Sequence, residues 1–185
     1  MRHVRVVTAL VLALGAAPAT VATAHEFNAT AMGKLTLKAA GIARFRNAAG
    51  AVECKQQKVA LGDAVLASKT LQLTIEYSGC TAFGLAATLS PGRYELNAEG
   101  SASLLNTVTA KALACLVTFP SAKNKNLGTV KYVQTGKEIE LVQALSGITS
   151  SGVGAACSFA EESKGLFTDV SLLSLASGAG SVEWK

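Results

Sequence analysis

His25 is the residue whose type and position most directly suggest chemistry. A histidine at the N-terminus of a processed chain can bind copper through its α-amine and a ring nitrogen, but such a site needs at least one further histidine. The other histidine of the sequence, His3, lies in a segment that we expect to be removed. The sequence therefore predicts no metal site at His25.

Two other arrangements resemble the residue pairs that hydrolases use. Ser68 and Lys69 are adjacent, as in a Ser–Lys dyad, but neighbouring residues of a strand point to opposite faces of a sheet. Glu138 and Glu140 share one strand face about 7 Å apart, within the range of glycosidase carboxylates. Lys137 flanks them, which is typical of a solvated face. The sequence predicts no catalytic residue, and a hydrolase with an unrecognised carboxylate or Ser–Lys site is the alternative.

Cation and phosphate sites are also not predicted. A calcium loop gathers several Asp and Asn ligands, whereas Asp63 and Asp169 are far apart in the sequence. Gly152-Val153-Gly154 precedes no Gly-Lys-Ser/Thr motif, so it does not indicate a phosphate-binding loop. We expect no cofactor.

The four cysteines predict disulfides. An even number of cysteines in an exported chain indicates a disulfide framework, and four cysteines allow three connectivities. We favour the sequential pairing, because each pair then brackets a comparable strand-rich stretch. A structural zinc site would need ligands at close spacing, which these cysteines lack. The predicted pairs are Cys54–Cys80 and Cys115–Cys157.

The N-terminal segment is typical of a Sec signal peptide. Residues 1–5 form a short basic region that contains Arg2 and Arg5, residues 6–15 form an apolar stretch, and Ala22 and Ala24 are the small residues that a signal peptidase accepts. The apolar stretch is too short for a membrane anchor. We expect residues 1–24 to be removed and residues 25–185 to form one secreted, extracellular domain. Cleavage after Ala19 is the alternative.

The charge of the expected domain is modest. The whole chain carries a net charge of +5, and removal of Arg2 and Arg5 lowers it to +3. The remaining lysines are scattered, with Lys123 and Lys125 as the densest pair, whereas a nucleic-acid surface shows clustered basic residues. We predict no nucleic-acid partner and no membrane span after signal cleavage.

The elements that must position these residues are strands. In residues 69–77, apolar and polar side chains alternate with the period of a half-buried antiparallel strand. Turn sequences separate this stretch from similar ones. The strong candidates are 34–38, 69–77, 93–97, 115–119 and 138–141, and the weaker ones are 42–46, 51–54, 57–61, 84–89, 102–110, 128–133, 166–175 and 180–184.

This pattern predicts an all-β domain, an antiparallel sandwich or barrel of about ten short strands. The nearest helical candidates are Gln57–Leu66 and Ser158–Lys164. The latter opens with a capping-box pattern, which favours one helical turn. Residues 146–156, rich in Gly and Ser, predict a loop.

Several segments resemble a group of small, uncharacterised exported proteins of high-GC bacteria. These are His25-Glu26-Phe27, residues 77–84 (Tyr-Ser-Gly-Cys-Thr-Ala-Phe-Gly), residues 90–97 (Ser-Pro-Gly-Arg-Tyr-Glu-Leu-Asn) and residues 182–185 (Val-Glu-Trp-Lys). The resemblance implies an exported bacterial protein and assigns no activity. Together with the missing catalytic motifs, it leads us to expect a non-enzymatic binding or cell-surface domain whose partner is an extracellular ligand or surface.

Overall fold

The chain forms fourteen antiparallel strands within the residues that the computed structural model describes, which are 24–123, 125, 127–155, 157, 162–176, 178 and 180–185. The predicted all-β class is confirmed, but the strands are more numerous and longer than expected. They are β1 (Phe27–Ala29), β2 (Leu35–Ala39), β3 (Ala43–Asn47), β4 (Gly50–Leu61), β5 (Thr70–Ala82), β6 (Leu85–Leu89), β7 (Gly92–Asn97), β8 (Ser101–Leu104), β9 (Val108–Ala112), β10 (Cys115–Phe119), β11 (Gly128–Thr135), β12 (Glu138–Val153), β13 (Glu162–Leu175) and β14 (Val182–Trp184).

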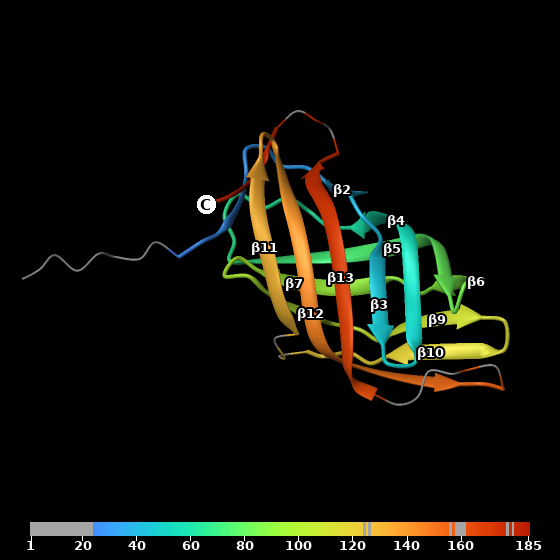
Figure 1. Cartoon of the computed structure of the whole chain (residues 1–185). Coiled ribbons are helices and arrows are strands. Elements are labelled where there is room, and N and C mark those ends of the chain that lie inside the picture. Colours follow the sequence, from blue (N-terminus) through green and yellow to red (C-terminus); the bar gives the residue numbers. More distant parts are fainter. Residues whose placement is uncertain are drawn as a thin grey trace, which may run out of the picture.

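Eight of these strands close into a ring. Following the hydrogen-bonded neighbours from β3 leads through β4, β5, β7, β8, β11, β12 and β13 back to β3. Figure 1 shows β11, β12 and β13 side by side, with β5 and β7 crossing behind them at a steep angle. β2 extends the wall by pairing with the second half of β13. Of the two predicted architectures, a sandwich and a barrel, the closed ring corresponds to the barrel.

A smaller sheet grows out of the ring because two strands are long enough to belong to both. The last residues of β5 pair with β6, and the last residues of β12 pair with β10. β9 joins β6 to β10 and completes this second sheet, which projects at the lower right of Figure 1. β5 and β12 therefore hold the two parts of the fold together.

The inward faces of the ring strands form the core. In β13 every second residue from Gly165 to Leu175 is buried, and β12 shows the same alternation from Ile139 to Leu145. Aromatic rings fill the centre, with Phe45 lying 4.3 Å from Phe167 and 4.8 Å from Phe119 between ring centroids. The alternation read from the sequence thus separates core residues from solvent-facing ones.

Three expectations were wrong in detail. Residues 146–153 are not a loop but the second half of β12, paired with β13 and β10. The helical candidate Gln57–Leu66 is strand as far as Leu61. The stretch 102–110 divides into β8 and β9 around residues 105–107.

The expected helical turn at Ser158–Lys164 falls partly outside the described residues. Residues 158–161 are not described, and β13 begins at Glu162. Within the described part of the chain there is no helix, and hence none that could cross a membrane.

A short strand pair, of which the sequence predicted one strand, joins distant parts of the chain. β1 lies antiparallel to β14, with Phe27 opposite Trp184. Glu26 and Lys185 extend the pairing through two backbone hydrogen bonds, of 2.8 and 3.1 Å. β14 was among the weaker strand predictions, whereas β1 was missed because three residues are too few to show a period.

Candidate functional site

A cleft opens where β4 diverges from β5. The pairing of these two strands ends with a register shift at Leu61 and Thr74. Beyond this point the residues after β4 pair with the start of β2 and the residues just before it. The Leu35 amide donates to the Gly62 carbonyl, and the Ala64 amide donates to the Gly33 carbonyl, both at 2.9 Å. The resulting space measures about 600 Å³. Cavities of this size hold small organic ligands.

The lining combines a charged rim with an apolar floor. Its apolar residues include Leu73 and Tyr94, which are core residues only 2% and 3% exposed. Its polar residues come from four separate segments of the chain. The polar side chains are Lys34, Asp63, Gln72, Thr74 and Arg93, and the apolar ones are Leu35, Val59, Ala60, Leu73, Tyr94 and Leu105.

The rim is cationic. The charged lining residues are two cations, Lys34 and Arg93, and one anion, Asp63. Their formal charges sum to +1. None of these three takes part in the ion pairs found among the described residues, which are Arg44–Glu53, Lys58–Glu76 and Lys185–Glu183. Both cationic groups can therefore serve a ligand.

The backbone of Arg93 is fixed by its neighbours. Its amide donates to Asn106 Oδ1 at 2.7 Å, and its carbonyl accepts the Leu105 amide at 2.7 Å. The guanidinium thus extends from a rigid strand beginning, which is a better support for recognition than a free loop.

Tyr94 anchors the floor. Its hydroxyl lies 2.6 Å from the Tyr77 hydroxyl inside the ring. Burial raises the pKa of both phenols well above the ordinary value near 10, so both remain neutral. A β-carbon added at Gly92 would lie 2.6 Å from the Tyr94 ring, so glycine at this position leaves room for that ring. The floor is therefore a fixed surface.

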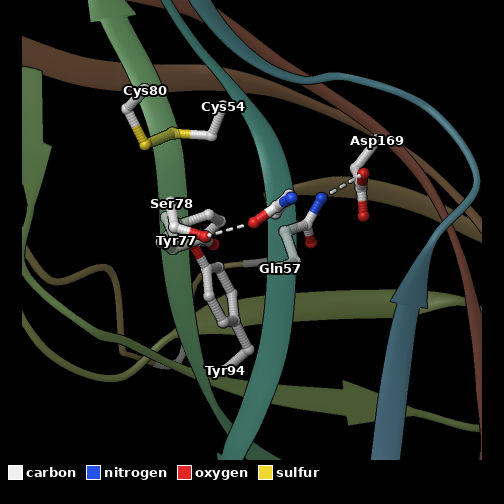
Figure 2. The surroundings of a disulfide bond; sticks show 8 residues. Cys54, Gln57, Tyr77, Ser78, Cys80, Tyr94 and Asp169 are labelled. Carbon is white, nitrogen blue, oxygen red and sulfur yellow. Dashed lines mark hydrogen bonds between the residues drawn. A yellow bond between two sulfur atoms is a disulfide. The ribbon is translucent and has the colours of Figure 1, made fainter. Parts of the chain in front are cut away.

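Behind the floor, the interior of the ring contains a buried carboxyl group. Asp169 is 2% exposed and accepts hydrogen bonds from Gln57 Nε2 at 2.7 Å and from Gln143 Nε2 at 3.3 Å. Figure 2 shows the Gln57 contact beside the two tyrosines. Burial raises the pKa of Asp169, although the hydrogen bond from Gln57 opposes this shift.

Both predicted disulfides are confirmed. Cys54 and Cys80 are register partners in β4 and β5, with Cα atoms 4.0 Å apart, and both are buried (Figure 2). Cys115 and Cys157 join the start of β10 to the segment after β12, with Cα atoms 4.7 Å apart. The bridges tie strands together and lie outside the lining of the cleft.

The residues considered for metal binding are not brought together. Asp63 lies at the cleft, whereas Asp169 is inside the ring. The His25 ring stacks on Trp184 with centroids 4.2 Å apart. Among the described residues, no three His, Cys, Asp or Glu side chains form a group that could hold a metal ion.

The residues considered for hydrolysis also do not build a site. Ser68 Oγ donates to the Thr70 carbonyl at 2.6 Å and accepts the Thr70 amide at 3.2 Å, so its hydroxyl is engaged by its own turn. Glu138 and Glu140 lie on β12, outside the lining of the cleft.

Sequence reasoning missed the cleft itself. Lys34 and Arg93 are the first residues of two stretches that side-chain alternation predicted to be strands, so their place at the start of a strand was expected. Their juxtaposition depends on the point at which β4 leaves β5, and no local pattern encodes it. Comparison of the chain with protein-family models, curated proteins and solved structures finds no match.

Proposed function

We propose that this protein is an exported, non-enzymatic binding domain that takes a small amphipathic anion in the cleft between β4 and β5. The observation that carries the proposal is that Lys34 and Arg93 line one cleft together with a fixed apolar floor. A ligand of matching chemistry has a carboxylate at one end and a hydrocarbon body.

Each part of such a ligand has a counterpart in the lining. A guanidinium binds a carboxylate through two parallel hydrogen bonds, and an ammonium adds a point charge. Leu35, Val59 and Leu105 offer apolar surface to the hydrocarbon body. Because Asp63 offsets one of the two cations, the rim suits a monoanion better than a dianion.

The same lining supports binding over hydrolysis. Glycoside hydrolysis requires two carboxylates, and nucleophilic hydrolysis requires a nucleophile with an adjacent base. The described lining of the cleft contains one carboxylate, Asp63, and no Ser, Cys or His. The hydrolase alternative therefore gains no support from this cleft.

Export remains part of the proposal. The expected signal peptide, residues 1–24, lies outside the described residues except for Ala24. Two disulfides in the described domain favour an oxidising compartment, because cytosolic thiols are kept reduced. Intact-mass measurement of secreted protein tests this part independently of the ligand.

The ligand class is tested with octanoate and 1-octanol as a matched pair. We expect octanoate to perturb the amide NMR signals of residues 34–35, 62–63, 72–74 and 93–94. Lys34→Gln and Arg93→Gln should each weaken octanoate binding about tenfold or more, since a hydrogen bond to a charged group contributes about 1.5–3 kcal/mol.

The control variant is Lys58→Gln, which removes a lysine whose partner is Glu76 and which lies outside the lining. It should leave octanoate affinity unchanged. Equal affinity for octanoate and octanol, or octanoate-induced shifts confined to other surfaces, would refute the proposed ligand class.

A further inference from the structure

We propose that proteolytic cleavage of the Ala24–His25 bond completes a binding site for the new N-terminus, in which the α-ammonium group of His25 pairs with Glu99. The inference rests on the expected processing at this bond and is independent of the ligand proposed for the cleft. This ion pair forms only after cleavage and attaches the new N-terminus to Glu99.

The first argument is the position of the His25 nitrogen. This atom donates to Glu99 Oε1 at 3.1 Å. The His25 ring stacks on Trp184 with an interplanar angle of 19°. Glu26, the next residue, is held by two backbone hydrogen bonds to Lys185. The nitrogen is therefore directed at the carboxylate by contacts on both its ring and its following residue.

The second argument is the support of Glu99. It lies in the turn between β7 and β8, where its amide donates to Asn97 Oδ1 at 2.8 Å. Two aromatic side chains bind the same turn: Trp184 Nε1 donates to the Ala98 carbonyl, and the Tyr132 hydroxyl donates to the Asn97 carbonyl, both at 2.8 Å. The residue that stacks on His25 thus also fixes the turn that carries its partner.

The third argument is the hollow around this pair. It measures about 640 Å³ and is lined by His25, Glu99, Lys131, Tyr132 and Trp184, among others. The charged or titratable side chains of this lining are those of Glu99, His25, Lys131 and Tyr132. Of these, only Glu99 is an anion at neutral pH. The α-amine consequently has one anionic partner among the lining residues.

Cleavage changes the chemistry of the contact. A peptidase that accepts small residues, here Ala22 and Ala24, adds water across the amide bond. Ala24 leaves with a carboxylate, and the His25 nitrogen becomes a primary amine that takes up a proton. A free α-amine has an ordinary pKa of about 7.7–8.0. A hydrogen bond from a neutral amide to the Glu99 carboxylate thereby becomes an ion pair, in which donor and acceptor are both charged.

The experiment compares two chain starts and two residues at position 99. One protein begins at His25 and the other at Ala24, each produced from a fusion whose removal leaves that residue first. Each is made with Glu99 and with Glu99→Gln. The readout is the pKa of the α-amine, measured by NMR after isotopic labelling of that group.

We expect the α-amine of the His25 form to titrate above its ordinary range and to return toward it in Glu99→Gln, by a few tenths of a pH unit for a surface pair. In the form that begins at Ala24 the α-amine is one residue away, so Glu99→Gln should have little effect. Glu140→Gln, an acidic residue of β12 outside this hollow, is the matched control.

Two results would overturn the inference. One is an α-amine pKa in the His25 form that Glu99→Gln leaves unchanged. The other is secreted protein whose mass places its first residue anywhere but His25, for instance after Ala19. Octanoate binding should be unaffected by Glu99→Gln, so failure of this inference and failure of the proposed ligand are separate outcomes.

Discussion

At the scale of single residues, Asp169 is a carboxyl group in an unusually buried setting. It is buried inside the ring, where Gln57 and Gln143 donate hydrogen bonds to its carboxyl oxygens. A buried carboxylate without a cationic partner is costly when ionised, which is why burial raises its pKa. This single group should therefore make stability depend on pH.

We predict that Asp169→Asn removes this dependence. The native state keeps a proton that the unfolded chain loses near pH 3.9, so the stability due to the neutral acid is full below that pH. It is lost as pH rises through the raised native pKa. The Asn variant should gain about 1.4 kcal/mol at neutral pH for each pKa unit by which burial displaces the group.

The measurement is urea denaturation of both proteins at intervals between pH 4 and 8. The difference in unfolding free energy should grow with pH in favour of Asp169→Asn. Asp63→Asn, which removes a carboxylate at an exposed position, is the control against which the trend of Asp169→Asn is compared. A constant deficit of Asp169→Asn at every pH would contradict the prediction.

At the scale of elements, side-chain alternation predicted β2, β7 and β10 to within one residue, and it located the start of β5 but not its last five residues. It failed for the second half of β12, whose Gly and Ser residues looked like a loop. The reason is visible in the pairing with β13, where the register shifts on either side of Ile148. A β-carbon at Gly165 would lie 2.6 Å from the Ile148 carbonyl oxygen. Small residues mark a close approach of two backbones here, which the sequence alone cannot distinguish from a flexible loop.

This reading predicts that Gly165→Ala destabilises the fold. The added methyl group meets backbone, which cannot rotate away, so we expect a loss of about 1–3 kcal/mol in unfolding free energy. Gly33→Ala is the matched control, because its β-carbon would lie 3.5 Å from a Leu175 methyl group, an ordinary contact. Comparable urea midpoints for the two variants would show that β12 and β13 can separate at this point.

The cleft likewise could not be predicted from the sequence, although the strands around it could. Arg93 and Lys34 belong to strand beginnings that periodicity located correctly. Their presence in one cleft depends on the register shift after Val59, where β4 turns away from β5. Register shifts of this kind follow from three-dimensional pairing, so a one-dimensional pattern does not contain them.

At the scale of the whole molecule, the two disulfides differ in what they connect. Cys54–Cys80 spans 26 residues and Cys115–Cys157 spans 42. The chain-entropy model gives each about 3.5–4 kcal/mol, with the longer loop favoured by only a few tenths. Burial separates them further, since Cys54 and Cys80 are 0% and 6% exposed, whereas in the second bridge Cys115 is 3% exposed and Cys157 is only partly buried.

We therefore predict that the Cys54→Ala/Cys80→Ala protein is less stable than the Cys115→Ala/Cys157→Ala protein. The first loses a bridge and also leaves space in the core, while the second mainly releases the segment after β12. Each loss of about 2–5 kcal/mol is large against a total of roughly 5–15 kcal/mol. Thermal melts of both proteins test the order, and the reverse order would show that the segment after β12 matters more than the packing around Cys54.

Strands that are synthesised early pair with strands that are synthesised late, and this limits when the native fold can form. β3 pairs early with β4, but its second partner is β13, which is also the partner of β2, and β1 finds its partner in β14. At about 5–20 residues per second, a ribosome delivers those partners on the order of ten seconds after the strands that need them. Until then the ring is an open sheet whose edges can pair with any other chain. The growing chain must therefore stay unfolded or be shielded for most of its synthesis, and its native structure can assemble only as the final strands are made.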